Sequence, residues 1–367
     1  MDQIPNGNIM TILTGLAVGL MLGFVLQRGR FCMNTAFRDV VFIKDLTLFR
    51  TYLLALVIAI VGANLMEDLG WLVSVSPDTG KLVTEELRRQ SFLPVANIVG
   101  GYLFGLGIVL AGGCGSGILF KVGEGVIAAG VAVLGFFIGI AATLHGVLSP
   151  VYDWLTGFDV QIAGKDNPAL WDLFGSGPVV KWVTIAVFCS ILLIVVAKGK
   201  PFGKAKKGYY WSTTGVLTGI IVIIAWWASS YFGGGPRGLS FTNPLKELFF
   251  TILTKSSNAN DPEFNFFGLF KATWSALYVI GVPLGAYLSA RGLKEFKWKV
   301  PPADELITVF LGSLLMGFGA AVGGGCNVGH GLTGSSTMAI SSIVTTIFIL
   351  LGNWTMAYFR FIRPMQD

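Results

Sequence analysis

The chain has 367 residues, of which 53% are hydrophobic and 13% are charged, with a formal net charge of +6. Soluble globular domains carry charge on about a quarter of their residues, so this composition excludes a soluble protein. Apolar windows of about 20 residues recur along the chain, which is the length that a bilayer requires of a helix. The composition therefore predicts an all-α integral membrane protein. The positive charge does not indicate a nucleic-acid partner, because basic residues of membrane proteins gather in cytoplasmic loops.

Nine apolar windows follow one another in the sequence, and we expect each to cross the membrane. The N-terminal sequence MDQIPNGN lacks the positive region of a cleaved signal peptide, so the first window is expected to be retained as a span. An odd number of crossings places the two termini on opposite sides. The predicted spans are 9–27, 46–66, 95–120, 126–147, 180–197, 209–232, 264–290, 306–325 and 337–359.

Charge in the connections between spans predicts the orientation. Lysine and arginine gather in the connections at 28–50, 198–207 and 291–299 and again after 359, whereas acidic residues are richer in the alternate connections. Basic loops stay in the cytoplasm. We therefore predict an N-terminus outside the cell and a cytoplasmic C-terminus.

Two glycine-rich stretches indicate an internal repeat. The sequence GGYLFGLGIVLAGGCGSG at 100–117 aligns with GSLLMGFGAAVGGGCNVG at 312–329, so that Cys114 falls on Cys326. Nearly the same shift carries RGRFCMN, from Arg28, toward RGLSFTN, where Phe241 takes the place of Cys32. A repeat of roughly 210 residues explains both matches.

The repeat defines the predicted domain organisation. An odd number of spans separates the two copies, so the second copy is inverted in the membrane. We interpret the chain as one transmembrane domain, 1–367, with glycine–cysteine helix breaks near the midplane. The first repeat is 9–147, an outer loop, linking span and basic loop occupy 148–208, and the inverted second repeat is 209–359.

The breaks combine features that favour a soft anion. Glycines interrupt each helix, and a half-helix N-terminus presents free N–H groups and a partial positive charge. One thiol, a soft and polarisable group, is added at each break. We predict a path for a sulfur-containing anion past Cys114 and Cys326. The flanking supporting positions are Gly113, Gly115, Gly325 and Asn327.

Other features have plainer interpretations. The GxxxG pairs Gly19/Gly23 and Gly101/Gly105 are typical of close helix packing. Cys189 lies in an unbroken apolar run and is interpreted as a small core residue. None of the four cysteines forms a CxxC pair, which argues against a thioredoxin-like motif and a disulfide framework.

His330 and four charged residues complete the candidate set. His330 lies four residues after Cys326, and with the three motif cysteines it would complete a Cys3His zinc site. The paired-ligand spacing of structural zinc sites is absent, so we expect no metal, and a neighbouring carbonyl to hold the ring. Arg28 and Arg30 are candidates for attracting the leaving anion. Lys121 and Glu124 follow the first break and are expected to pair with each other at the membrane edge.

Three blocks, QRGRFCMNTAFRD, GLGIVLAGGCGSG and MGFGAAVGGGCNVGHG, resemble in order and spacing the signatures of the YeeE/YedE family of bacterial inner-membrane proteins. Better-understood members of that family take up thiosulfate. The resemblance implies a helical inverted-repeat fold in which Cys32, Cys114 and Cys326 line the thiosulfate path. It also implies a bacterial inner-membrane location and, in many relatives, a small cytosolic sulfur-carrier partner of the TusA type.

Our leading hypothesis is a transporter that imports thiosulfate by S–H···S contacts with the three thiols. No Walker A pattern is present, so the chain is not expected to hydrolyse nucleotide, and no cofactor is predicted. Three alternatives remain at this stage. They are a selenium-anion transporter, a membrane sulfurtransferase or oxidoreductase with a persulfidated cysteine, and a thiol-lined metal transporter or zinc-stabilised scaffold.

Overall fold

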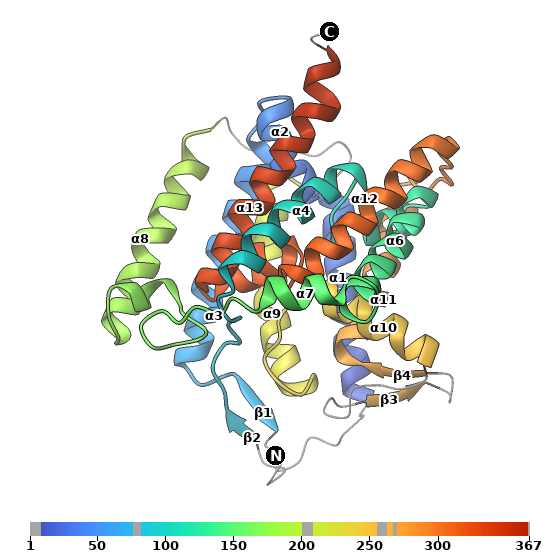
Figure 1. The fold of residues 1–367 in the computed structure, drawn as a ribbon. Helices are drawn as coiled ribbons and strands as arrows, with labels where there is room; N and C mark the ends of the chain where they lie inside the picture. The colour runs from blue at the N-terminus through green and yellow to red at the C-terminus, as the bar shows by residue number, and fades with distance from the viewer. Residues whose placement is uncertain (1–8, 76–81, 200–207, 255–262, 267–269, 366–367) are drawn as a thin grey trace.

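Apolar windows become helices because in hydrocarbon every backbone amide must find its partner within the segment. The computed structural model of the chain describes residues 9–75, 82–199, 208–254, 263–266 and 270–365 (Figure 1). Among these residues, eight segments are long and apolar enough to cross a membrane. The protein is therefore a multi-pass, all-α membrane protein, as its composition predicts.

Eight of the nine predicted spans correspond to these segments. Their helices keep close to the predicted boundaries, because the apolar windows end at charged or turn residues. The helices are α1 (Ile9–Gly29), α3 (Thr47–Asp68), α4 (Pro94–Leu110) with α5 (Gly115–Gly123), α6 (Ile127–Leu144), α8 (Pro178–Ala197), α9 (Trp211–Phe232), α12 (Ala303–Val322) and α13 (Ile340–Ala357).

The remaining predicted span, 264–290, differs from the structure. Its first part forms a hairpin of β3 (Glu263–Phe266) and β4 (Phe270–Thr273), and helix α11 (Trp274–Gly292) follows. Thr273 starts the helix by accepting a hydrogen bond from the amide of Ala276 at 3.2 Å. α11 is not among the eight apolar segments, because Arg291 and, to a smaller extent, its tyrosines, serines and Pro283 lower its hydropathy. It nevertheless packs along α1.

Shorter elements connect the spans or lie at the ends of the molecule. The β1–β2 and β3–β4 hairpins lie at the lower end of Figure 1, and α2 and the end of α13 lie at the upper end. The shorter elements outside the β3–β4 hairpin are α2 (Met33–Phe42), β1 (Val73–Val75), β2 (Leu82–Thr84), α7 (Ser149–Thr156), the 3-10 helix η1 (Leu170–Leu173), α10 (Thr242–Thr254), the π-helix η2 (Gly329–Gly334), η3 (Tyr358–Ile362) and η4 (Arg363–Met365).

Packing partners correspond between the two halves of the chain. α1 packs against α11 while α9 packs against α3, and α6 packs against α12 while α13 packs against α4. A repeat that exchanges partners between its copies would produce these pairs. The inverted repeat itself, with boundaries 9–147 and 209–359, stays a prediction.

Glycines allow the closest of these contacts. A Cβ on Gly19 or Gly23 of α1 would overlap a backbone carbonyl of α11. A Cβ on Gly105 of α4 would likewise overlap the carbonyl of Ile349 on α13. The interpretation of the GxxxG pairs as close packing is confirmed. α8 makes fewer contacts, standing at one side of the molecule against α3 (Figure 1).

Candidate functional site

The first glycine stretch ends one helix and starts another. α4 closes with Ala111 in a helical conformation, and Gly112 then adopts a φ of +71°, which favours glycine. Cys114 has extended backbone angles and is the N-cap of α5, whose first hydrogen bond runs from the Ile118 amide to the Cys114 carbonyl at 2.8 Å. Cys114 thus stands at the start of a half-helix.

The second glycine stretch has the same local geometry. α12 closes with Gly323, and Gly324 adopts a φ of +81°. Cys326 directly precedes the next helical residue, Asn327, and its carbonyl accepts a hydrogen bond from the His330 amide at 2.8 Å. Cys326 therefore occupies the same position at its break as Cys114 does at the first.

Cys32 provides a third cysteine at a helix start. After α1 ends, Arg30 takes a left-handed φ of 54°, which redirects the chain into α2. Cys32 is the N-cap of α2, and its carbonyl accepts a hydrogen bond from the Ala36 amide at 2.9 Å. Each motif cysteine thus precedes free N–H groups and the positive end of a helix dipole.

The three cysteines meet in the interior. Cys32, Cys114 and Cys326 are 4%, 0% and 0% exposed, and the sulfur atoms of Cys32 and Cys114 are 3.9 Å apart. A Cβ built on Gly115, next to Cys114, would lie 3.9 Å from the Cβ of Cys326. The Cys32 and Cys114 sulfur atoms are therefore in contact, and the buried Cys326 lies close to the start of the same half-helix as Cys114.

A cavity of about 100 Å³ lies near Cys326. Its floor includes Gly329, where an added Cβ would lie 3.9 Å from the Cys326 sulfur. Arg88, Arg237 and Glu247 also line it, and Glu247 accepts a hydrogen bond from the Thr273 hydroxyl at 3.1 Å. We call this the outer cavity.

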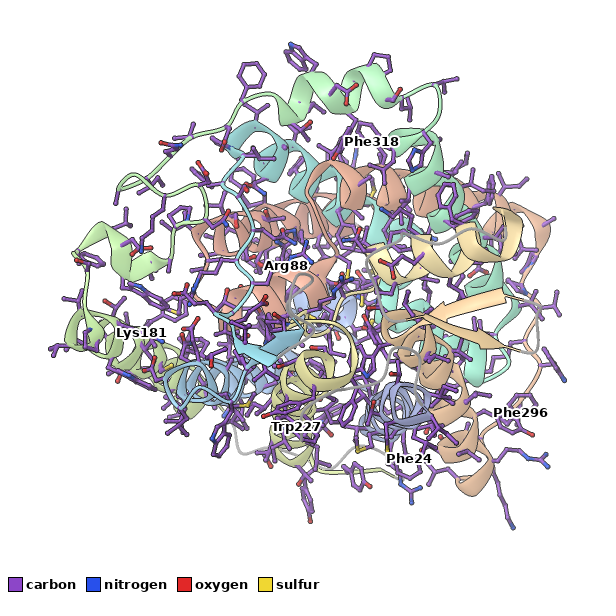
Figure 2. All side chains as sticks on the ribbon, turned by 90° about the horizontal axis from the view of Figure 1, so that it is seen from below. Phe24, Arg88, Lys181, Trp227, Phe296 and Phe318 are labelled. Carbon is purple, nitrogen blue, oxygen red and sulfur yellow. The ribbon has the colours of Figure 1, made fainter. Side chains whose placement is uncertain are left out.

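A wider space adjoins the outer cavity. It has a volume of about 490 Å³ and shares Arg88 and Gln90 with the outer cavity. Seen from the hairpin end, Arg88 lies near the middle of the molecule, whereas Lys181 and Phe296 lie toward opposite rims (Figure 2). Arg88 thus lies near the centre of this face, where it lines both spaces.

A third space lies at the other end of α5. It has a volume of about 330 Å³ and is lined by four basic and two acidic residues. Gln27 lies beside it, donating to Glu124 at 3.1 Å and to Glu295 at 3.4 Å. We call it the inner cavity. Its lining residues are Arg30, Glu124, Lys294, Glu295, Lys297 and Lys299.

Lys121 and Glu124 do not pair as expected. The Lys121 ammonium donates to the carbonyl of Gly112 at 2.6 Å, while Glu124 accepts from Gln27. The physical reason is that α4 ends at the break with free carbonyl groups, which attract a cation. Lys121 therefore stabilises the C-terminal end of the broken helix.

The two arginine candidates lie away from the sulfur atoms. Arg30 forms an ion pair with Glu295 and is 44% exposed in its side chain. Arg28 lies over the rings of Phe24 and Tyr209 at 5.4 and 5.9 Å. Of the two, only Arg30 lines the inner cavity.

The supporting glycines make room at the breaks. A Cβ on Gly115 would lie 3.0 Å from the Cβ of Phe241, and one on Gly113 would lie 3.2 Å from Ile118. A Cβ on Gly325 would lie 3.0 Å from the His330 ring. Side chains at these positions would therefore crowd the residues that shape each break.

His330 is held by protein atoms on both ring nitrogens. Nε2 lies 2.8 Å from the carbonyl of Gly323, and Nδ1 lies 3.1 Å from the hydroxyl of Ser342. A carbonyl only accepts, so Nε2 carries the hydrogen and Nδ1 accepts from Ser342. The expectation that a carbonyl holds this ring is confirmed.

Asn327 stands out as a buried amide. The residue is 0% exposed, and neither its amide oxygen nor its amide nitrogen has a hydrogen-bond partner within the described chain. Buried polar groups are nearly always paired, so an unpaired one requires an explanation. Its place directly after Cys326 makes it a candidate contact for an anion at that thiol.

Sequence reasoning missed several residues of the site. The Ser116 hydroxyl lies 3.4 Å from the Cys114 sulfur, and Arg88, Gln90 and Arg237 line the outer cavity. The sequence could have indicated Ser116, because this residue follows Cys114 by two positions at a predicted helix start. The outer residues come together only through tertiary contacts, and no local pattern indicates them.

Comparison with known proteins identifies the family. The family described as Sulphur transport matches residues 28–355. The chain belongs to this family. The resemblance of its three cysteine blocks to the YeeE/YedE proteins is thereby confirmed.

Two relatives named as transporters align with nearly the whole chain, and a third aligns with part of it. The thiosulfate transporter TsuA of Spirochaeta thermophila is 34% identical over 360 residues, covering 96% of this chain and 100% of the relative. The thiosulfate transporter TsuA of Escherichia coli is 31% identical over 375 residues, covering 97% and 96% respectively. A probable transporter of Xylella fastidiosa is 33% identical over 82 residues, covering 22% of this chain and 60% of the relative.

Proposed function

We propose that this protein imports thiosulfate into the cytoplasm along a path lined by Cys32, Cys114 and Cys326. The observation that carries the proposal is the meeting of three helix-start cysteines next to the outer cavity. The two relatives named as thiosulfate transporters, which align over nearly the whole chain, support the same substrate. Transport, and not catalysis, is the role we assign to the chain.

The outer cavity is suited to receive a divalent oxyanion. Arg88 and Arg237 supply positive charge there, which raises the local concentration of an anion. Free N–H groups after Cys326 then replace water around the oxygens, and the unpaired Asn327 amide offers one more donor. The terminal sulfur of thiosulfate, less hydrated than its oxygens, can face the thiol.

Passage beyond Cys326 depends on the thiols. A sulfur atom that leaves the Cys326 thiol next meets Cys114 and then Cys32, whose sulfur atoms already lie 3.9 Å apart. The space beside them, lined by Leu22, Phe31 and Ser116 among others, has a volume of about 10 Å³. That volume admits no polyatomic anion, so the helix starts must separate briefly during each passage.

The inner cavity is the proposed exit. It offers Arg30 and three lysines to an anion that has passed Cys32. A small cytosolic sulfur carrier of the TusA type is the partner we propose for the released sulfur. This arrangement requires the hairpin end to face outside and the C-terminus to face the cytoplasm of a bacterial inner membrane.

Uptake of sulfur-labelled thiosulfate into proteoliposomes tests the transport proposal. We expect wild-type protein to accumulate label without a partner protein, and Cys114→Ala to lose this uptake. Cys189→Ala is the matched control, because Cys189 lies on α8 and belongs to no break. Equal uptake by both variants would contradict the path.

Reporter fusions test the proposed orientation. Alkaline phosphatase folds to an active enzyme only outside the cytoplasm, so a fusion after residue 365 should be inactive. A fusion within the connection between α6 and α8 should be active. The reverse pattern would overturn the assignment of the inner cavity as the exit.

A further inference from the structure

The sulfur atoms of Cys32 and Cys114 are close enough to react with each other. They are 3.9 Å apart, and both cysteines are free thiols in the structure. A disulfide requires about 2 Å between the sulfur atoms, so together they must approach by about 2 Å. Rotation of side chains accounts for movements of this size.

Little in the surroundings prevents this approach. Neither cysteine uses its side chain to cap the helix that it precedes. Gly117 lies beneath both sulfur atoms, at 2.6 and 3.4 Å from the position of an added Cβ, so the absence of a side chain leaves them this space. The contact of the Ser116 hydroxyl with the Cys114 sulfur, at 3.4 Å, is weak.

We propose that Cys32 and Cys114 form a reversible disulfide under peroxide, and that this bond closes the path. The two cysteines belong to different segments, one at the α1–α2 junction and the other at the start of α5. The bond would fix these segments together and remove two of the three thiols. The loss of transport rests on the proposed function, whereas formation of the bond does not.

The chemistry needs one hydrogen peroxide for each bond. One sulfur attacks peroxide, so that an S–O bond forms, the O–O bond breaks and water leaves, giving a sulfenic acid. The second sulfur attacks the sulfenic sulfur, so that the S–S bond forms, the S–O bond breaks and a second water leaves. Two thiols are oxidised and one peroxide is reduced to two waters. A reduced dithiol reverses the change by exchange.

The other two cysteines differ in their surroundings. Among the described residues, neither Cys326 nor Cys189 has a sulfur partner like that between Cys32 and Cys114. Cys189 lies on α8, which packs mainly against α3. These two residues therefore serve as internal comparisons for selectivity.

Peptide mapping by mass spectrometry without reduction tests the bond directly. Wild-type protein in liposomes is treated with hydrogen peroxide, and the remaining free thiols are then alkylated. We expect the peptides of Cys32 and Cys114 to appear joined and two hydrogens lighter than their sum. The joined species should persist in Cys326→Ser, vanish in Cys114→Ser, and disappear on treatment with dithiothreitol.

Uptake by the same vesicles tests the closure. Thiosulfate uptake should fall by about tenfold on oxidation and recover with dithiothreitol, since thiol oxidation to a disulfide is reversible. Oxidation of Cys32 and Cys114 to separate sulfinic acids, or a bond from Cys114 to Cys326, would overturn the proposed pairing. A complete Cys32–Cys114 bond with unchanged uptake would overturn the closure, even if the transport proposal holds.

Discussion

At the scale of single residues, the proposed path depends on the absence of side chains at glycines as well as on the thiols. Gly117 faces the sulfur atoms of both Cys32 and Cys114 from the first turn of α5. Alanine is the better helix former by about 1 kcal/mol, so helix stability alone would favour it at this position. Glycine fits this position because the two sulfur atoms occupy the space that a side chain would need.

Gly117→Ala is expected to impair transport while the protein stays folded. The added Cβ would stand 2.6 Å from the Cys32 sulfur, so this thiol must move from its present position beside Cys114. We expect thiosulfate uptake to fall, because the displaced thiol no longer lines the proposed path as it does in the wild type.

Gly130→Ala is the matched control for this substitution. Gly130 also lies inside a helix, α6, but nothing lies within 4 Å of its added Cβ. Uptake and thermal stability of Gly130→Ala should match or exceed the wild type. If Gly117→Ala transports as well as Gly130→Ala does, the sulfur contact has no role in passage.

At the scale of elements, the broken helices require partners for their exposed ends. Lys121 donates to the Gly112 carbonyl after α4, and Arg360 donates to the carbonyl of Leu110 at 3.1 Å. After α12, His330 and Gln90 donate to Gly323 and Gly324, at 2.8 and 3.1 Å. Cations therefore cap the first break, and donors without a fixed charge cap the second.

His330→Ala is expected to destabilise the second break. The Gly323 carbonyl would keep only the long contact with the Asn97 amide, at 3.5 Å, and a poorly satisfied buried acceptor costs up to about 1–3 kcal/mol. His330→Gln keeps an amide donor and should lose less stability in thermal unfolding. A chelator should leave the unfolding temperature of wild type unchanged, since both ring nitrogens already have protein partners. Equal losses in the two variants would refute the cap.

The sequence predicted the breaks because their signal is local. A glycine run inside an apolar window interrupts a helix wherever it occurs, and a cysteine beside it is visible in the sequence. The start of α11 was misplaced because the hydropathy signal before it is ambiguous. Phe264, Phe266, Phe267 and Phe270 extend the apolar window before Trp274, and hydropathy alone does not separate a β-hairpin from a helix.

Contacts between distant segments explain what else the sequence did not reveal. Arg88 and Arg237 meet at the outer cavity from positions far apart in the chain. Lys121 has Glu124 as a neighbour along its own helix, which suggested an ion pair. Lys121 instead donates to the carbonyl of Gly112, which the helix break leaves without a helical partner. The sequence alone does not show that this carbonyl lies within reach of Lys121.

At the scale of the whole molecule, charge is arranged along the proposed route. Two arginines and one glutamate line the outer cavity, the three cysteines are buried, and four basic and two acidic residues line the inner cavity at the other end of α5. An anion is thus attracted at both ends and restrained in the middle. Such an arrangement favours selectivity at the cysteines, because only an anion that tolerates an apolar, thiol-lined passage crosses.

Arg88→Gln is expected to weaken capture of the anion. Arg88 lines both the outer cavity and the wider space above it, so loss of its charge should raise the KM for thiosulfate about tenfold. The maximal rate should change little, and the KM of the variant should depend less on salt than that of wild type. Arg363→Gln, in η4 at the other end of the chain, should leave KM unchanged. An equal shift in both variants would show that net charge and not position matters.

The central claim is that the thiols recognise the terminal sulfur of the anion. Sulfate has the same charge and carries oxygen where thiosulfate carries its terminal sulfur. The most direct measurement compares initial uptake rates of labelled thiosulfate and labelled sulfate by wild-type protein in the same proteoliposomes. The account predicts rapid uptake of thiosulfate and none of sulfate above protein-free vesicles. Equal rates for the two anions would contradict it.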